Sequence, residues 1–346
     1  MMKKTISQCM IVKNEEKNIR RALSWGKDIM CEQIVVDTGS SDRTVEIARE
    51  MGAKIFFFPW INDFAAAKNF AIDQAKGDWI AFLDADESFT PEDTKKIPEI
   101  LEYVGDDVDG LLTGIVDLDE NNHITSGGTM IRFFVNRPDL RYVGKIHEHL
   151  VRKGRSGLHL TDATEQLAFL HTGYQEQEKK DKSKFERNLN IILEILKQEP
   201  ENCDYLGYLG DTYSSDGKNE EARDAYKKAV AAMPEKLEVY DQRSSYTYTN
   251  LLRVSQCLNA PEAEVEAIYK EAVEKLPKEP DFDCVMGEWY WRKGQYEKAV
   301  QMYELAIAKL ETYGTVNRGI ITTSMLIQMY ECLGEGCRKL GDYQKA

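Results

Sequence analysis

Hydrophobic positions in the first half of the chain alternate between short buried runs and amphipathic segments. Apolar runs of strand length occur at residues 5–12, 33–37, 54–58 and 79–83. Segments with helical spacing of their apolar positions separate them, at residues 14–25, 43–51 and 63–75. Pro91 opens one more predicted helix, and further strands are predicted at 110–117 and 129–136. Strands alternating with helices in this way indicate βαβ units on a mostly parallel sheet.

From about residue 175 the apolar positions recur only at helical spacing, and a repeat appears. One copy has the small, aromatic and proline positions of a tetratricopeptide repeat: Leu206, Leu209, Gly210, Tyr213, Gly217, Ala222, Tyr226, Ala229 and Pro234. A second copy has Met286, Gly287, Tyr290, Gly294, Ala299, Tyr303 and Ala306, and a weaker one has Tyr269, Ala272 and Pro277. Small residues let two helices approach and aromatic rings fill the gap between them. We therefore predict an α/β domain over 1–174 and an all-α tetratricopeptide domain over 175–346.

The last predicted repeat is incomplete. Its first helix would carry Met325, Met329, Leu333 and Leu340, but the sequence stops at Ala346 where the second helix should begin. A repeat without its second helix leaves an apolar face uncovered. We expect either that the natural chain is longer or that a partner covers this end, and a homodimer through the tail is the simplest such arrangement.

Composition and charge exclude several classes of protein. The chain of 346 residues is 42% hydrophobic and 10% aromatic, which excludes global disorder. Its net charge of −14 argues against nucleic acid or an anionic membrane as the main partner. No apolar run approaches the roughly 18 residues of a membrane span. The seven cysteines are scattered without a C-x-x-C pair, which is typical of a reduced cytoplasmic protein without structural zinc.

The segment WIAFLDADE places two carboxylates, Asp84 and Asp86, directly after an apolar strand. Ligands of α/β sheets bind at the carboxyl ends of the strands. Oxygen ligands of this kind suit Mg²⁺ or Mn²⁺, held by one or two carboxylates together with substrate phosphates. This pair therefore predicts a divalent cation site.

A second motif, IVVDTGSSDRT, ends another strand at Asp37. A tight turn at Gly39 and a helix cap at Ser41 or Asp42 explain the residues that follow. They do not explain Asp37, whose carboxylate could accept hydrogen bonds from a nucleobase or a ribose.

Four of the five histidines, His147, His149, His159 and His171, lie within 25 residues, and two of them are in GKIHEHLV. This clustering suits acid–base chemistry, although His159 is expected to be structural. A zinc peptidase is rejected because its two histidines stand four apart on a helix. His147 and His149 are two apart, which fits one face of a strand.

Taken together, CMIVKNEE, VVDTGSSDRT and FAAAKNFAIDQAKGDWIAFLDADE resemble the nucleotide-sugar half of inverting family 2 glycosyltransferases over residues 5 to about 90. The resemblance implies the Rossmann-like GT-A fold and a UDP-sugar donor. It implies donor contacts from Met10, Ile11, Val12, Glu15, Asp37, Lys68, Asp84 and Ala85. Met10 to Val12 and Glu15 would border the uridine, and Asp37 would bind uracil or ribose. Lys68 stands near the diphosphate, where the family often has arginine.

Family members with a tetratricopeptide tail often show a similar G-x-I-H-E segment followed by H-x-G-Y, here HTGY. This resemblance implies that Glu148 or His147 is the general base. It also implies that His171 joins Asp86 and Asp84 on the metal. The combination of this catalytic half with a tetratricopeptide tail resembles the S-glycosyltransferases that modify bacteriocin peptides, and also flagellin-type protein glycosyltransferases.

We therefore expect a metal-dependent enzyme that moves a sugar from a UDP-sugar, with inversion, to a hydroxyl or thiol of a peptide or protein. One alternative is a transferase for a lipopolysaccharide core or another cell-envelope glycan. A second is a catalytically inactive tetratricopeptide scaffold, which would predict loss of the acids, yet all candidate positions are filled. A nucleotidyltransferase is disfavoured because CMIVKNEE lacks a phosphate loop rich in glycine and lysine.

Overall fold

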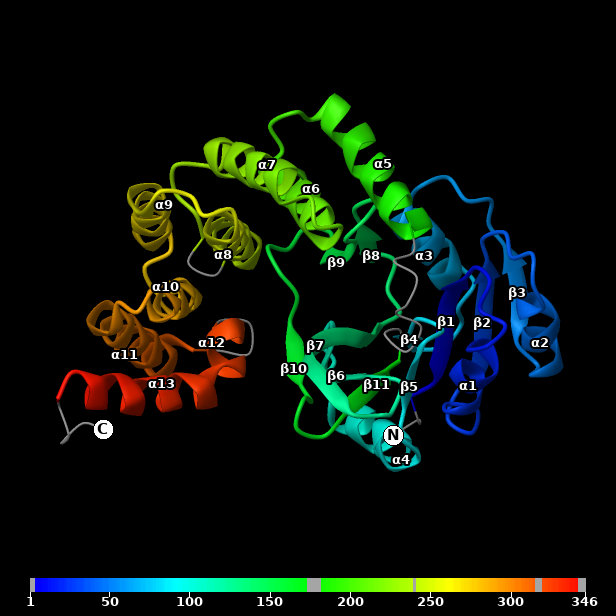
Figure 1. Cartoon of the computed structure of the whole chain (residues 1–346). Coiled ribbons are helices and arrows are strands. Elements are labelled where there is room, and N and C mark those ends of the chain that lie inside the picture. The colour runs from blue at the N-terminus through cyan, green and yellow to red at the C-terminus, as the bar shows by residue number, and fades with distance from the viewer. Residues whose placement is uncertain (1–3, 173–181, 239–240, 315–318, 342–346) are drawn as a thin grey trace. The chain divides into compact units, whose positions relative to one another are not determined.

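The chain forms two compact units, residues 1–182 and 183–346. The computed structural model (Figure 1) describes residues 4–172, 182–238, 241–314 and 319–341. The domain boundary predicted after residue 174 lies outside the described residues. Each unit has its own hydrophobic core.

The first unit is built on one large mixed sheet. Its strands in the described residues are β1 (Ile6–Val12), β2 (Glu32–Asp37), β3 (Lys54–Phe57), β4 (Trp79–Phe82), β5 (Glu87–Phe89), β6 (Gly110–Leu118), β7 (Ile124–Val135), β10 (Leu160–Asp162) and β11 (Ala168–His171). The strand order is β3-β2-β1-β4-β7-β6-β11-β5, with β10 paired to β6. The first four strands pair in parallel, as predicted, whereas β7 is antiparallel to both its neighbours. A separate hairpin joins β8 (Leu140–Val143) to β9 (His149–Arg152).

Within the described part of this unit, four helices accompany the sheet: α1 (Ile19–Ser24), α2 (Thr44–Glu50), α3 (Phe64–Asp73) and α4 (Pro91–Tyr103). Side chains cap two of them, since Asp63 accepts from the N–H of Ala66 and Thr90 from that of Asp93. The helix predicted from residue 14 begins only at Ile19. Asn14 has a left-handed φ of 57°, so a turn replaces the first predicted helical residues.

The central strands are buried on both faces, as a parallel sheet between helices requires. Along β1, Cys9 packs in one cluster with Ile34 and Ile80, and its neighbour Met10 packs in another with Val35. The alternation of β-strand side chains thus fills two core layers. The carboxyl ends of β1, β2 and β4 are thereby fixed at one edge of the sheet.

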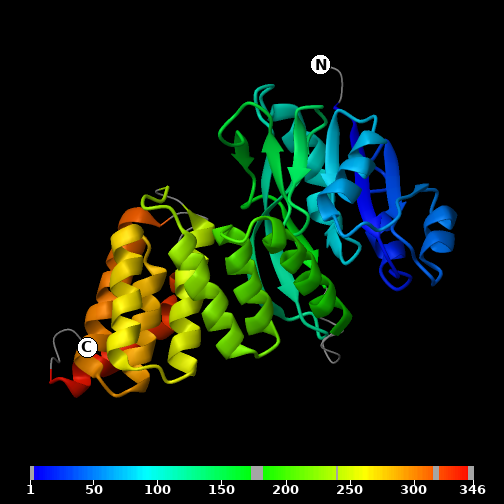
Figure 2. The ribbon, with the colours of Figure 1, turned by 90° about the horizontal axis from the view of Figure 1, so that it is seen from above.

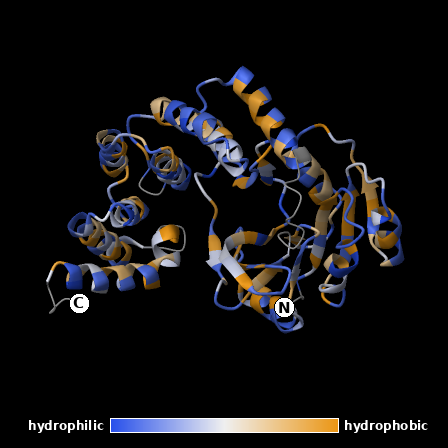
Figure 3. Cartoon of the chain, viewed as in Figure 1, coloured by the Kyte–Doolittle hydropathy of each residue, from blue (hydrophilic) through white to orange (hydrophobic). Residues whose placement is uncertain are grey.

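The second unit is helical throughout its described residues. Its helices are α5 (Lys182–Gln198), α6 (Cys203–Ser215), α7 (Asn219–Ala232), α8 (Gln242–Cys257), α9 (Glu262–Lys275), α10 (Asp281–Arg292), α11 (Tyr296–Tyr313), α12 (Ile320–Ser324) and α13 (Leu326–Lys339). Consecutive helices from α6 to α11 lie side by side (Figure 2). Hydrophobic and hydrophilic stretches alternate along α5 (Figure 3), as expected for a helix packed on one side only.

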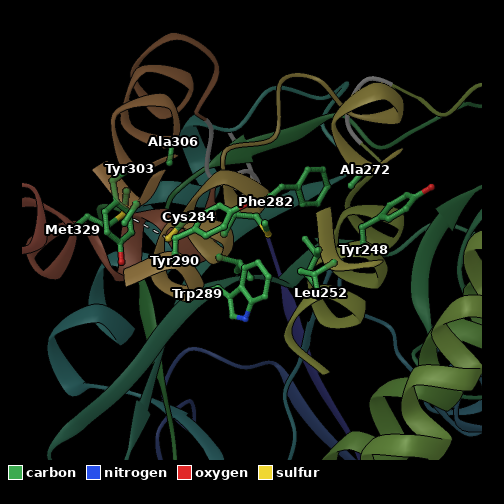
Figure 4. Close-up of a cluster of buried hydrophobic side chains, with 14 of the residues drawn as sticks. Tyr248, Leu252, Ala272, Phe282, Cys284, Trp289, Tyr290, Tyr303, Ala306 and Met329 are labelled. Carbon is green, nitrogen blue, oxygen red and sulfur yellow. Dashed lines mark hydrogen bonds between the residues drawn. The ribbon is translucent and has the colours of Figure 1, made fainter. Parts of the chain in front are cut away.

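The glycines of the two clear repeats have the packing role that the sequence predicts. A Cβ added at Gly210 would lie 2.4 Å from the Tyr226 ring, and one at Gly287 would lie 2.7 Å from the Tyr303 ring. Any larger residue would push the paired helices apart. The core of this unit gathers Tyr248, Phe282 and Tyr303 between helices (Figure 4).

The prediction of an uncovered apolar face on the last helix is wrong for three of its four residues. Met329 is fully buried, with its sulfur 3.6 Å from that of Cys284 (Figure 4). Met325 and Leu333 are partly buried against the same core, because α13 packs on α11. Leu340 remains 49% exposed. The helix therefore folds back on its own array through these residues. Ile327 and Tyr330 of α13 remain exposed, and a tail-to-tail dimer stays a prediction.

All seven cysteines are free thiols. Across the described ranges, none of the helices combines the length and the apolarity that crossing a membrane requires.

Candidate active site

The loops that follow β1 and β2 are tied together by hydrogen bonds between side chains and main chain. The N–H of Asn14 donates to Ser40 Oγ (2.9 Å), and Asn14 Oδ1 accepts from the N–H of Ser41 (2.8 Å). The N–H of Glu16 donates to Asp42 Oδ2 (3.1 Å). These bonds explain why Asn14 adopts its left-handed conformation. They also give the edge of the sheet a fixed shape where the uridine was expected.

The residues predicted to border the uridine fall into two groups. The side chains of Met10 and Val12 belong to the core, so these residues present only main chain to a ligand. Ile11 packs partly buried against the opposite core layer. Glu15 lies in the loop, where its N–H donates to Thr44 Oγ1 (2.6 Å).

Asp37 has a local structural role that the sequence analysis did not foresee. Its carboxylate is buried and accepts hydrogen bonds from the N–H groups of Gly39 and Ser40, each at 3.1 Å. The strand–turn junction therefore accounts for this residue as well. A role in binding uracil or ribose stays a prediction.

Lys68 connects the two acidic groups to which the sequence assigned different roles. Its Nζ lies 2.7 Å from Glu148 Oε1 and 4.0 Å from Asp84 Oδ1. The side chain is buried and its ammonium stands 5.0 Å from the ring centre of Tyr142. Burial lowers the pKa of Lys68, but Asp84 and the other nearby acidic groups outweigh it and raise the pKa above its ordinary value. Lys68 thus pairs with two carboxylates, and its place near the diphosphate stays a prediction.

Arg132 on β7 is a member of this cluster that the sequence analysis missed. Its Nη2 lies 3.2 Å from Asp84 Oδ2 and also pairs with Glu87, while its guanidinium stacks 5.2 Å from the ring centre of Phe169. Burial alone would raise the pKa of Asp84, but Lys68 and Arg132 hold it below its usual range. For Glu87 burial prevails, and its pKa is raised. A signal did exist, since Arg132 is a charged residue inside the apolar run MIRFFV.

The GKIHEHLV segment is anchored beside α3. Asn69 of α3 exchanges two hydrogen bonds of 2.9 Å with the main chain of Tyr142, and the N–H of Phe64 donates to the carbonyl of Lys145 (2.8 Å). The expectation that His147 and His149 share a strand face is wrong. His147 has a left-handed φ of 54° and lies in a turn, and β9 begins only at His149.

Within that turn the two candidate bases differ. The side chain of Glu148 is only 14% exposed and faces Lys68, whereas His147 is exposed. Glu148 and His147, the two candidate bases, therefore differ in how far their side chains are buried.

His171, at the end of β11, joins the Asp84-Ala85-Asp86 segment. Its Nε2 lies 3.4 Å from Asp86 Oδ2 and its Nδ1 lies 2.8 Å from Asp117 Oδ1. The hydrogen bond to Asp86 is the main cause that raises the pKa of His171 to about 9. The next residue, Thr172, donates from N–H and Oγ1 to the carbonyl of Asp86, both at 3.1 Å. The late histidine and the early acidic motif are thus brought together.

The metal set predicted from the sequence is only partly assembled. Asp86 and His171 offer an oxygen and a nitrogen close enough to bind one ion, and this donor pair suits Mn²⁺ or Mg²⁺ completed by phosphates. Asp84 instead directs one oxygen toward Lys68 and the other toward Arg132. In the described ranges no group of three His, Cys, Asp or Glu side chains is placed to hold a metal ion. Ala85, between the two acids, is buried.

The remaining histidines lie apart from these contacts. His149 is exposed at the start of β9. His159 pairs with Asp107 at 3.1 Å, in keeping with the structural role expected for it.

Comparison with known families agrees with this geometry. Residues 7–151, which include the loops after β1, β2 and β4 and the GKIHEHLV segment, match the glycosyl transferase family 2 profile. The N-terminal unit is a family 2 glycosyltransferase domain. Residues 205–235 and 285–314 match tetratricopeptide-repeat profiles, which confirms the repeats predicted at these positions.

Several known proteins are similar to this chain. The SPbeta prophage-derived glycosyltransferase SunS of Bacillus subtilis is 33% identical over 231 residues, which are 65% of this chain and 53% of SunS. A tetratricopeptide-repeat protein of Synechococcus elongatus is 40% identical over 41% of this chain and 34% of its own length. The chain thus spans about half the length of SunS and about a third of the length of the Synechococcus protein. Among solved structures, S. aureus TarS 1–349 in complex with UDP-GlcNAc has a TM-score of 0.45 and 16% identity, covering 75% of this chain and 93% of that one.

Proposed function

We propose that this chain transfers a sugar from a UDP-sugar, with inversion, to a thiol or hydroxyl of a peptide or protein. The observation that carries the proposal is the contact of Lys68 with both Asp84 and Glu148. Through this contact the buried ammonium of Lys68 pairs both with Asp84, an acid expected to serve the donor, and with Glu148, the candidate base for the acceptor. An inverting transfer needs these two functions on either side of a single reacting carbon.

Glu148 is the base in this proposal. The acceptor's proton would pass to its carboxylate as the acceptor attacks the anomeric carbon and the bond to UDP breaks. Its mostly buried side chain is fixed by Lys68, so the accepting oxygen has a defined position. His147, by contrast, is exposed to solvent at a left-handed φ of 54°.

Asp84 and Asp86 serve the donor in different ways. Asp84, fixed between Lys68 and Arg132, would accept hydrogen bonds from hydroxyls of the ribose or the transferred sugar. Asp86 and His171 would hold the divalent cation. When bound, such a cation neutralises the charge that develops on the leaving diphosphate. Asp37 and the loop carrying Glu15 would hold the uridine.

A peptide acceptor is supported by the helical unit and by the similarity to SunS. Tetratricopeptide arrays present extended surfaces that suit an extended chain. The sequence resemblance to bacteriocin-peptide S-glycosyltransferases points in the same direction. A thiol acceptor makes modest demands on the base, since a free cysteine has a pKa of about 8.5. A reducing cytoplasm as the place of action is consistent with the seven free thiols.

A donor panel tests this proposal. Purified chain is incubated with Mn²⁺ and one UDP-sugar at a time, with and without peptides that carry a single Cys or Ser. UDP release is measured together with the mass of the peptide. We expect release with one or a few donors and a peptide heavier by one sugar residue. UDP release without a modified peptide would contradict the acceptor, and no release with any donor would contradict the activity.

A further inference from the structure

Asp117, near the end of β6, contacts the imidazole nitrogen of His171 that does not face Asp86. Asp117 Oδ1 lies 2.8 Å from Nδ1 of His171, and Asp86 Oδ2 lies 3.4 Å from Nε2. In the sequence, Asp117 follows the apolar run GIV of β6 and belongs to none of the motifs described above.

The sheet itself fixes this contact. In the parallel pairing of β11 with β6, His171 stands directly opposite Asp117. In the antiparallel pairing of β6 with β7, Asp117 stands opposite Ser126. The three residues therefore form a row across adjacent strands, where side chains on one face are neighbours. Their relative positions are set by main-chain register.

Both oxygens of Asp117 are already engaged. One contacts His171, and the other accepts a hydrogen bond from Ser126 Oγ. Its side chain is only 14% exposed. This carboxylate is consequently placed to orient a neighbour rather than to bind a ligand itself.

Because a carboxylate only accepts, the nitrogen of His171 that faces Asp117 must be the donor. Nε2, which faces the Asp86 carboxylate, also donates while no cation is bound, and it would give up its proton to bind a metal ion. A histidine that binds a metal commonly donates its other ring N–H to a carboxylate, which fixes the ring and its tautomer.

We infer that Asp117 is a positioning residue that makes His171 a ligand for the divalent cation of the donor site. This inference rests on the proposed function, in which Asp86 and His171 hold that cation. Asp117 acts through His171 alone, so its removal weakens cation binding only while His171 is present. Ser126 holds Asp117 in the orientation that this role requires.

The test is a double-mutant cycle in which the affinity of the full chain for Mn²⁺ is measured in saturating UDP. The electron paramagnetic resonance signal of free Mn²⁺ gives this affinity. The variants are Asp117→Leu, Asp117→Asn, His171→Ala and the double variant Asp117→Leu/His171→Ala. Asp119→Leu is the matched control, because it breaks another Asp–His contact, with His123, nearby in the same hairpin. The affinity for UDP without metal is measured for each variant.

Loss of an outer carboxylate of this kind weakens metal binding about 10- to 100-fold, and we expect that loss in Asp117→Leu. Asp117→Asn should lose less, because its amide oxygen still accepts from Nδ1–H. Asp117→Leu should add nothing to His171→Ala, and Asp119→Leu should bind as the wild type does. If Asp117→Leu does not fold, Asp117→Asn completes the cycle, with an expected loss of several-fold.

Three results would overturn the inference: wild-type affinity in the Asp117 variants, an undiminished loss in the His171→Ala background, or absence of Mn²⁺ binding by the wild type. None of them depends on sugar transfer. Failure of the proposed function would instead appear as absent turnover in the donor panel.

Discussion

Lys68 Nζ lies 2.7 Å from the carboxylate of Glu148, although the two residues come from α3 and from a turn far along the chain. The same ammonium is 4.0 Å from Asp84. One buried cation therefore fixes the distance between the donor motif and the candidate base. It also stabilises a pair of acids that would otherwise repel each other.

Replacing Lys68 should damage both stability and activity. Lys68→Met leaves Glu148 and Asp84 without their shared cation, and removing one partner of a buried pair costs about 3–5 kcal/mol. We expect a loss of about 3 kcal/mol in the N-terminal unit. Hydrogen exchange of β1 and β4 peptides as a function of urea measures it.

A double variant separates this interaction from lost packing. Lys68→Met/Glu148→Gln should be less destabilised than the sum of the two single variants, since contacting residues are not additive. Strict additivity would mean that the 2.7 Å contact contributes nothing.

Metal removal should abolish transfer without unfolding the chain. Asp86→Asn removes a charged oxygen ligand, so we expect most of the activity to be lost and the melting temperature to be unchanged. Excess EDTA should have the same effect on the wild type, and added Mn²⁺ should reverse it. Asp106→Asn, at an exposed loop position, is the control. Full activity of Asp86→Asn or in EDTA would refute the metal role.

The buried carboxylate of Glu32 should make stability depend on pH. It accepts from Ser7 Oγ (2.7 Å), Lys54 Nζ (2.6 Å) and the N–H of Lys76 (2.6 Å). Burial raises the pKa of Glu32, but these partners outweigh it and bring the pKa below its ordinary value.

A folded-state pKa below the unfolded one, about 4.3, stabilises the fold above that pH, and the effect is lost as the pH falls through the folded value. Glu32→Gln should therefore cost about 1–3 kcal/mol at pH 7. The difference from the wild type should shrink below about pH 4, as urea unfolding at several pH values will show. Glu50→Gln, in an exposed pair with Arg20, should have little effect. A Glu32→Gln penalty independent of pH would contradict this account.

In the helical unit, the close approach at Gly287 can be tested by a single methyl group. Its added Cβ would lie 2.7 Å from the Tyr303 ring, so Gly287→Ala should destabilise by about 1–3 kcal/mol. The penalty should fall in a Tyr303→Leu background, where the ring is absent. Calorimetric melting of the wild type, the two single variants and the double variant measures both effects. An equal penalty in both backgrounds would show that the ring is not the obstacle.

Local and periodic features of this molecule could be predicted from its sequence. Alternating strands and helices give the sheet because each element carries its own apolar pattern. The glycine and tyrosine of each repeat are neighbours in one helical hairpin, so Gly210 and Tyr226 reveal their contact by spacing alone.

Contacts between distant segments could not be predicted in this way. The motifs singled out Asp84, Asp86 and Glu148, but they do not show that Lys68 pairs with Asp84 and Glu148. The roles of Arg132 and Asp117 depend on strand order and register, which no local pattern specifies. The loop bonds of Asn14 likewise join residues after two different strands, and they shortened a helix that propensity favoured.

The most direct test of the account is the rate of sugar transfer by Glu148→Gln with the donor identified by the panel. Removing a general base costs roughly 10²–10⁴ in rate, and the amide keeps the shape of the side chain. We predict a loss in that range with unchanged affinity for UDP, a smaller loss for His147→Ala, and none for the exposed Glu165→Gln. Transfer by Glu148→Gln within threefold of the wild-type rate would contradict the account.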